Sequence, residues 1–351
     1  MKSPGSSYAA EIATELSAAW VRLRTPTFRG FHNVTYLTTA DSGEQASILR
    51  ERRPAPVLVP RIWPDEAEVL RSLEGAGMEL APRVLWASAD GTLLCLTFLQ
   101  GESPAPEAHV RAKIGDCFKS IVAVPRERMP ELPLDWPEDG DTGGFLQWLA
   151  MFAEDTVDRG TRKELGTLLE ELGIPDGVMT GYRERLPRLR PRPFALLHAD
   201  LHRNNLVLGL DGELRIIDWE HAMIGDPVHE LAVHLRRSAY SKVHWQGVVE
   251  TWRAAVSAVD ARFAMGVDRD LGHYLDFERA QSVFPDVLRA AKSLGAEVEA
   301  PALRRAVQRI GLALAAAAEP LDLRQLPDAA RIEKVLRDWH HVTRAAARTG
   351  S

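Results

Sequence analysis

Four polar residues near the middle of the chain have the types and the spacing that phosphoryl transfer needs. His198, Asp200 and Asn205 form the pattern H-x-D-x-x-x-x-N, and Asp218 follows them after two short apolar runs. An aspartate can orient an attacking hydroxyl through its acceptor oxygens, while hard oxygen ligands hold Mg²⁺ against phosphates. We therefore expect Asp200 to face the hydroxyl, and Asn205 with Asp218 to bind the metal. Each residue alone could cap a turn, but the whole set at this spacing favours chemistry.

The two apolar runs predict a hairpin that brings the metal ligands together. Residues 206–208 and 214–217 have the composition of strands, and an Asp-Gly dipeptide typical of tight hairpin turns lies between them. Pairing of these strands would place Asn205, before the first strand, close to Asp218, after the second. Upstream, the apolar residues 193–197 predict a buried strand that leads into the H-x-D pattern.

The segment 196–232 resembles the catalytic core of the aminoglycoside phosphotransferase and choline kinase family, relatives of protein kinases that phosphorylate small molecules. That family's motifs H-G-D-L-H-x-x-N, I-D-[WF]-E and G-D-P-x-x-D-L-A appear here as HADLHRNN, IDWE and GDPVHELA. The D-F-G motif of protein kinases is absent from the sequence, and no A-P-E follows the catalytic loop, where protein kinases carry it. The resemblance implies that Asp200 is the catalytic base, that Asn205 and Asp218 bind magnesium, and that His198 braces the loop.

Two positions of this block depart from the family pattern. Ala199 replaces the usual glycine, which is tolerable if its φ angle is negative. Glu230 replaces the usual aspartate, which puts only a structural contact in doubt.

Weaker matches to the same family lie upstream of the catalytic block. Residues 27–36 resemble the phosphate-covering loop G-G-x-x-N-x-x-Y and supply Asn33, although only one glycine of the motif remains. Arg50 ends a predicted strand, where the family has the cation that touches the α- and β-phosphates of the nucleotide. A solvated strand-end charge is the alternative for Arg50, and the other arginines that could take its place are Arg52, Arg53 and Arg61.

A predicted helix and a second predicted strand complete the nucleotide site that the resemblance implies. Residues 65–73 have the apolar periodicity of a helix, and Glu66 matches the family's glutamate that pairs with the phosphate-binding cation. Residues 93–99 are similar to the family's hinge strand, whose main chain hydrogen-bonds adenine, and Thr97 and Leu99 are its expected contact residues. The implied cofactors are ATP, with GTP as an alternative, and Mg²⁺.

These elements together predict an α+β, bilobal, protein-kinase-like fold. The resemblance implies a nucleotide-binding N-lobe over 1–100, with an antiparallel sheet and one helix. A mostly helical C-lobe over 101–351 would carry the catalytic loop and the substrate-binding helices. The apolar patterns add a lead-in helix over 8–20 and a long helix over 270–294, which we expect to be kinked or broken at Pro285.

Composition excludes several classes of protein. The net charge of −6 and the pI near 6.0 oppose a nucleic-acid partner, since no basic stripe dominates. The count of two cysteines excludes a disulfide framework or a cysteine-rich zinc site. No apolar run approaches the ~20 residues of a membrane span and no signal peptide is visible, so we expect a cytoplasmic protein without a membrane partner.

The leading hypothesis is an ATP-dependent kinase that phosphorylates a hydroxyl of a small molecule. The acceptor would be an antibiotic or related natural product (nucleoside, glycoside, macrolide or aminoglycoside) or, alternatively, a metabolic alcohol resembling choline, a sugar or an amino alcohol. A non-catalytic, nucleotide-binding pseudokinase would have lost Asp200, Asn205 or Asp218, and all are present. An acyl or nucleotidyl transferase is disfavoured because no activated Ser or Cys with an adjacent base is visible.

The balance of charges bears on the acceptor. Residues 101–300 include 33 acidic and 24 basic side chains, a mild excess that Arg159, Arg236 and Arg237 interrupt near the expected site. An acidic loop over 129–144 could line a cationic substrate site, although a solvated loop is the simpler interpretation. A polycationic aminoglycoside would need a denser wall of carboxylates, so we expect an acceptor that is not strongly cationic.

Overall fold

The computed structural model describes residues 28–29, 33–38, 47–104, 107–238, 240–295 and 297–349. The predicted lead-in helix over 8–20 and residues 27 and 30–32 of the phosphate-loop motif lie outside the described residues. By its contacts the chain divides into two compact units. The first comprises Met1–Ala55, Arg61–Leu134 and Phe194–Ala264, and the second comprises Pro56–Pro60, Asp135–Pro193 and Met265–Ser351.

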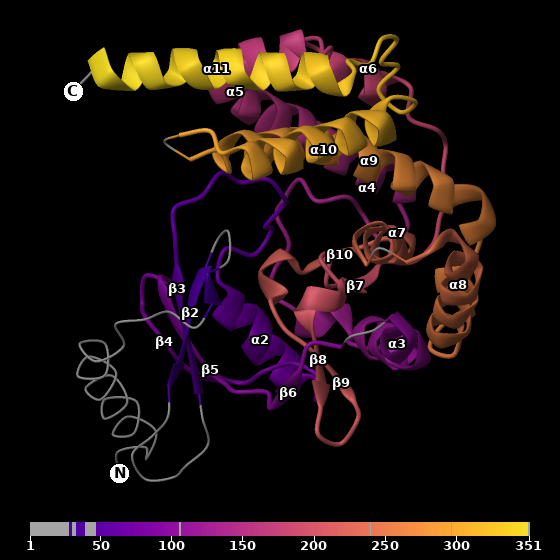
Figure 1. Ribbon diagram of the computed structural model, residues 1–351. Coiled ribbons are helices and arrows are strands. Elements are labelled where there is room, and N and C mark those ends of the chain that lie inside the picture. The colour runs from indigo at the N-terminus through magenta and orange to yellow at the C-terminus, as the bar shows by residue number, and fades with distance from the viewer. Residues whose placement is uncertain are drawn as a thin grey trace. The chain divides into compact units, whose positions relative to one another are not determined.

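An antiparallel sheet with one helix beside it begins the first unit (Figure 1). The strand order is β1–β2–β3–β5–β4, and the pairing of β3 with β5 sets Arg50 opposite Leu94. Helix α2 begins after Asp65, whose side chain accepts a hydrogen bond from the amide of Ala67 (2.9 Å), and it buries the apolar face that includes Leu70. The predicted sheet and helix are thus confirmed. Their bounds are β1 Phe28–Arg29, β2 Asn33–Thr38, β3 Ser47–Arg52, α2 Glu66–Gly75, β4 Val84–Ala87 and β5 Leu93–Thr97.

The predicted hairpin of the catalytic block is also present in the first unit. Strands β8 and β9 pair with Leu206 opposite Ile216, and Gly212 takes the left-handed conformation (φ +78°) in the turn. Strand β6 pairs with β8, where a Cβ atom on Gly101 would lie 2.2 Å from the carbonyl oxygen of Leu208, so only glycine fits. A separate ladder joins β7 to β10. The bounds are β6 Gly101–Glu102, β7 Ala195–Leu197, β8 Leu206–Gly209, β9 Leu214–Ile216 and β10 Met223–Gly225.

Three helices complete the first unit. Asp226 caps α7 by accepting a hydrogen bond from the amide of Val228 (3.0 Å), and Pro227 occupies the first turn, where its missing N–H is no loss. Helices α3 and α8 pack together. The bounds are α3 Glu107–Val122, α7 Pro227–Arg237 and α8 Lys242–Ser257, with short helical turns at Arg126–Arg128, Arg203–Asn205, Trp219–His221 and Ala261–Ala264.

The second unit is built from helices, as predicted for most of the C-terminal part of the chain. Helix α9 packs against α10 and α5, and α11 packs against α10 and α5 (Figure 1). A fully buried ion pair between Arg192 and Asp270 (2.7 Å) fixes the segment before β7 to the first turn of α9. The bounds are α4 Thr142–Phe152, a π-helical turn Ala153–Asp158, α5 Arg159–Glu171, α6 Val178–Glu184, α9 Val267–Lys292, α10 Ala300–Ala317 and α11 Ala329–Thr349.

The long helix α9 is not broken at Pro285, which was one of the two expected outcomes. It runs through Pro285 without a break, although proline cannot donate the helical hydrogen bond. Pro285 and its neighbours Phe284 and Val287 are buried, and this apolar packing offsets the lost hydrogen bond. The sequence patterns also gave no indication of the short elements β4, β10 and α6.

The compact units do not divide the chain at residue 100. The hairpin of the catalytic block and three helices fall in the same compact unit as the N-terminal sheet. The division by function, with nucleotide binding in 1–100 and catalysis and acceptor binding in 101–351, stays a prediction. Within the described residues, the helices are all too short or too polar to cross a membrane.

Candidate functional site

The loop that follows β7 is braced by His198, which is fully buried. Its Nε2 lies 3.0 Å from the carbonyl oxygen of Ile217, and its Nδ1 lies 3.3 Å from the amide nitrogen of Asp200. Burial lowers the pKa of His198 to about 4, so the ring is neutral near pH 7. The neutral tautomer with its proton on Nε2 satisfies both contacts, and it ties the loop to the residue that follows β9.

The residue after His198 corrects an expectation. Ala199 has a positive φ angle (58°), not the negative one that would make it an easy substitute for glycine. The left-handed conformation costs an L-residue about 1–2 kcal/mol, so surrounding contacts must hold it. Glu230 of α7 supplies them: its Oε2 accepts hydrogen bonds from the amides of His198 (2.5 Å) and Ala199 (3.0 Å). The family pattern has an aspartate at this position, and its structural contact is made here by Glu230.

Asp200 is buried and surrounded by basic side chains. Arg237, from the last turn of α7, donates to its Oδ1, and the Nε2 of His202 lies 3.5 Å from the same oxygen. Burial would raise the pKa of Asp200, but Arg237 and His202 outweigh it and hold the pKa well below its usual range. Asp200 is therefore a carboxylate that can accept a hydrogen bond from a hydroxyl.

The hairpin brings the two predicted metal ligands toward each other, as the strand pairing required. The amide of Ile217 donates to the carbonyl oxygen of Asn205 (3.0 Å), and Asp218 is the next residue. The Nδ2 of Asn205 donates to the backbone oxygen (3.0 Å) and to Oδ2 (3.1 Å) of Asp200, so its Oδ1 is the side-chain atom that could bind a cation. Asp218 has a left-handed backbone (φ 68°), an unusual conformation for a non-glycine residue and one found at functional sites.

Arg50 connects the sheet to this hairpin through two carboxylates. Its guanidinium pairs with Glu66 of α2 (2.9 Å) and with Asp218 (2.7 Å). Burial would lower the pKa of Arg50, but the negative charges of Glu66 and Asp218 outweigh it and raise the pKa. Glu66 also accepts a hydrogen bond from the amide of Trp219 (3.0 Å), so α2 is joined to the chain directly after Asp218. The predicted pair of Arg50 and Glu66 is thus present, although contact with a nucleotide stays a prediction.

Glu220 is the centre of a second set of contacts in the same cluster. Its Oε2 accepts hydrogen bonds from Arg61 and from the Nδ2 of Asn33 (3.2 Å), and its Oε1 lies 3.4 Å from His221. Burial would raise the pKa of Glu220, but His221 and Arg61 outweigh it and hold the pKa well below its usual range. Asn33, the predicted phosphate-loop residue, therefore lies beside the hairpin.

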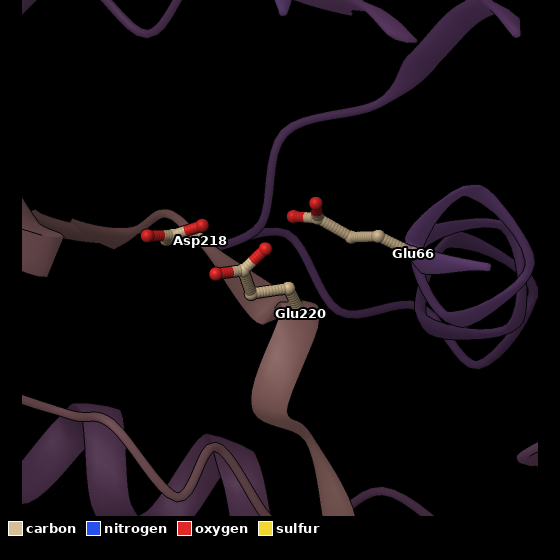
Figure 2. Close-up of side chains that lie close together, drawn as sticks. All are labelled: Glu66, Asp218 and Glu220. Carbon is tan, nitrogen blue, oxygen red and sulfur yellow. The ribbon is translucent and has the colours of Figure 1, made fainter. Parts of the chain in front are cut away.

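Figure 2 shows that the carboxyl groups of Glu66, Asp218 and Glu220 point toward one another, the first from α2 and the others from the segment after β9. One oxygen of each lies within 4.8 Å of the others. Carboxylate oxygens with an amide oxygen are the hard ligands that Mg²⁺ prefers, so the side chains fit the predicted ion. Arg50 and Arg61 neutralise this negative charge among the described residues.

The predicted hinge residues lie at the end of β5. The amide of Thr97 donates to the carbonyl oxygen of Arg83 (3.0 Å), and its hydroxyl accepts from the Arg83 amide (3.0 Å). Only the carbonyl group of Thr97 is therefore left for adenine, and Leu99 would have to supply the amide. Both contacts stay predictions.

Two arginines of the site were not identified as site residues by the sequence patterns. Arg61 was a rival for the place of Arg50, and Arg237 was noted only as a positive charge near the acceptor. Neither belongs to a local motif, because each reaches its carboxylate partner across a long stretch of chain.

The carboxylates of the predicted acidic loop, Asp135, Glu138, Asp139 and Asp141, are exposed, and Asp141 accepts a hydrogen bond from the amide of Gly144 (2.8 Å) as the cap of α4.

A model of the phosphotransferase enzyme family matches residues 25–271, well over half of the chain. In fold, the chain is similar to a choline/ethanolamine kinase family protein from Mesorhizobium loti, with 16% identity, a TM-score of 0.52, and coverage of 94% of this chain and 99% of that one. It is also similar to an ethanolamine kinase from Plasmodium vivax, with 11% identity, a TM-score of 0.57, and coverage of 82% and 80%. A macrolide 2′-phosphotransferase from Brachybacterium faecium gives 16% identity, a TM-score of 0.51, and coverage of 90% and 99%. These likenesses confirm the protein-kinase-like fold, and a search of curated proteins found no match.

Proposed function

The chain belongs to the phosphotransferase enzyme family, and from this premise we propose that it is an ATP-dependent kinase that transfers the γ-phosphate to a hydroxyl group of a small molecule. One observation carries the proposal. The H-x-D-x-x-x-x-N loop, the hairpin and the pair of Arg50 with Glu66 meet at Asp218 within a single compact unit. A pseudokinase would not need every part of this set.

The side chains divide the work of phosphoryl transfer. Asp200 orients the acceptor hydroxyl through a hydrogen bond to its carboxylate, and His198 keeps the loop in the conformation that presents it. Asn205 and Asp218 would hold Mg²⁺, which neutralises charge on the phosphates when it is bound. Arg50, held in place by Glu66, would bind the α- and β-phosphates. Asn33 and the main chain of Thr97 and Leu99 would contact the nucleotide.

Arg237 favours an acceptor that is not strongly cationic. Its guanidinium donates to the carboxylate that would receive the acceptor hydroxyl, and His202 lies 3.5 Å from the same oxygen. A polyamine brought to Asp200 would meet this positive charge, and like charges at short range oppose binding. We therefore favour a neutral or acidic antibiotic or related natural product, such as a nucleoside, glycoside or macrolide. A metabolic sugar-like alcohol is the alternative, and the same observation disfavours choline-like and aminoglycoside acceptors.

An ATP-consumption screen against a panel of hydroxyl compounds tests the function. The panel holds neutral glycosides, nucleosides, macrolides, sugars, amino alcohols and aminoglycosides. We expect turnover with a neutral or acidic member, and we expect Asp200→Asn to reduce kcat by a factor of about 10²–10⁴ while nucleotide affinity stays within a few-fold. Near-wild-type turnover by Asp200→Asn would contradict the role of Asp200. Efficient turnover of aminoglycosides alone would contradict the preferred acceptor and leave the kinase function standing.

A further inference from the structure

Arg61 has the same relation to Glu220 that Arg50 has to Asp218. Each guanidinium is largely buried and pairs with the cluster shown in Figure 2, Arg50 with Glu66 and Asp218 and Arg61 with Glu220. Arg50 comes from β3, whereas Arg61 comes from the linker between β3 and α2. The two arginines therefore approach the cluster from different segments of the chain.

A bound cation would change the partners of both arginines. Asp218 is a predicted ligand of Mg²⁺, and the nearest oxygens of Glu220 and Asp218 lie within 4.8 Å of each other. When a divalent cation draws on these carboxylates, Arg50 and Arg61 lose part of the negative charge that compensates them. A buried guanidinium without compensation is strongly destabilising, so an anion must take that place. The phosphate chain of the nucleotide is the anion that the proposed function brings to this cluster.

The surroundings of Arg61 also fit a phosphate chain. A pocket at the cluster is lined by three arginines, Arg50, Arg52 and Arg61, and by Asn33 of the phosphate-loop motif. The carboxylates Asp65, Glu66 and Glu220 also line it, and Glu66 and Glu220 are the partners of Arg50 and Arg61. Arg52 is exposed and its guanidinium donates to the neutral carbonyl oxygen of Pro64 (3.2 Å). Guanidinium groups bind phosphate through paired N–H donors, and several of them around one pocket form a site for an anion of high charge.

The sequence of the phosphate loop gives a reason for an additional cation. Glycine-rich loops bind phosphates through backbone amides that approach closely because no Cβ intervenes. Here only Gly30 of the motif's glycines remains, directly upstream of Asn33. A side-chain cation beside Asn33 can supply the positive charge that fewer accessible amides would leave missing.

We propose that Arg61 is a second phosphate-binding cation of the nucleotide site, which pairs with Glu220 in the free protein and with the terminal phosphates of ATP in the complex. The inference rests on the proposed function, because it requires a nucleotide. It assigns the terminal phosphates to Arg61, because the α- and β-phosphates are already the expected partners of Arg50. Arg50 keeps the α- and β-phosphates.

Calorimetric binding of three nucleotides in the presence of Mg²⁺ tests the assignment without turnover. The probes are AMP, ADP and the non-hydrolysable ATP analogue with an imido bridge. We expect Arg61→Gln to lower the affinity for the analogue about tenfold or more and the affinity for ADP by a smaller factor. The affinity for AMP should not change measurably, because the lost contacts are with terminal phosphates. Arg61→Lys, which keeps the charge, should lower these affinities less than Arg61→Gln does. Arg53→Gln, which removes an exposed arginine of the same linker, is the matched control and should bind all three like the wild type.

Three outcomes would overturn the assignment. An equal loss of affinity for all three nucleotides would mean that Arg61 acts only by keeping the site folded. A loss for the analogue that Glu220→Gln restores in the double variant would mean that Arg61 serves only to neutralise Glu220. Unchanged affinity of Arg61→Gln would remove the contact altogether. If the wild type binds none of the probes, the proposed kinase function fails as well, which separates that failure from the other three.

Discussion

At the scale of single residues, the state of Asp200 depends on two opposing effects. Burial alone favours the protonated acid, while Arg237 and His202 favour the carboxylate, and the basic side chains prevail. A carboxylate whose pKa lies below its usual range is a weak proton acceptor. Asp200 is therefore suited to orient a hydroxyl while phosphoryl transfer proceeds, and to receive the proton only as the new bond to phosphorus forms.

Replacing Arg237 by methionine tests this balance. The substitution keeps an unbranched side chain in place of the aliphatic part of arginine and removes its charge, so burial is no longer opposed by the nearest cation and the pKa of Asp200 should rise. A raised pKa protonates Asp200 at a higher pH, and the acidic limb of the kcat/KM profile should move upward in pH. The pH–rate profile measured with the acceptor found in the screen is the readout. Arg253→Met, which removes a charge from α8 of the same unit, should leave the limb in place, and an unmoved limb in Arg237→Met would contradict the coupling.

Ala199 offers a prediction about stability. Its left-handed φ angle of 58° is a conformation that glycine adopts without strain. Relief of about 1–2 kcal/mol of strain is partly offset by the larger entropy of glycine in the unfolded chain, about 0.5–1 kcal/mol. We expect Ala199→Gly to raise the free energy of unfolding by up to about 1 kcal/mol in urea denaturation. Ala222→Gly, at an alanine with an ordinary φ of −56°, should lower it. Destabilisation by both substitutions would show that Ala199 is not strained.

At the scale of elements, helix α7 supports the catalytic loop from both of its ends. Glu230, near its start, holds the amides of His198 and Ala199, and Arg237, in its last turn, reaches Asp200. Between them, His234 lies with its Nδ1 2.9 Å from the carbonyl oxygen of Leu201. One helix thus fixes the backbone of the loop on both sides of the predicted base. The G-D-P motif matters because Asp226 starts this helix at the correct residue.

The charge of Glu230 makes the attachment of α7 dependent on pH. Burial raises the pKa of Glu230 to about 7, although the amides of Ala199 and His198 oppose the rise. The native state therefore retains the proton to a higher pH than the unfolded chain does, and the stability tied to that proton is lost as pH rises from about 4.5 to about 7. Below this window both states are protonated, and above it both are ionised.

Glu230→Gln removes this titration while it keeps an oxygen that can accept from the two amides. The difference in unfolding free energy between variant and wild type should move in favour of glutamine as pH rises through the window, by up to about 3 kcal/mol, and then level off. Urea denaturation at several pH values measures the difference. Glu79→Gln, at an exposed glutamate of the same unit, should show no such trend. A constant difference for Glu230→Gln would mean that Glu230 is ionised throughout.

The elements also show what the sequence could predict. The hairpin of β8 and β9 and helix α2 were predictable because local signals define them, an Asp-Gly turn in one and a cap with an apolar face in the other. Arg237 and Arg61 were not, because their partners are far away in the chain and no spacing rule connects them. The conformation of Ala199 was left open for a related reason. The sign of its φ angle depends on the distant carboxylate of Glu230, which holds the amide in place.

At the scale of the molecule, the candidate site gathers residues from separate parts of the sequence into one compact unit. Arg50 and Glu66 come from the sheet and its helix, Asp200 and Asp218 from the catalytic block, and Arg237 from α7. At the site these elements are linked by charged contacts. Ligands that satisfy those charges should therefore stabilise the first unit as a whole.

This reasoning gives a prediction that needs no acceptor. Mg²⁺ with ADP, at about one hundred times the dissociation constant, should stabilise the native protein by about 2.7 kcal/mol and raise its Tm. Hydrogen exchange should slow together in β3, α2 and the β8–β9 hairpin, because binding joins these segments.

Asp218→Ala should abolish the magnesium-dependent part of the rise in Tm, since it removes the carboxylate that Arg50 and the metal would share. Asp116→Ala, at an exposed aspartate of α3, should keep the full increase. A magnesium-dependent rise that survives in Asp218→Ala would place the metal elsewhere, and protection confined to one segment would contradict a site assembled from all three.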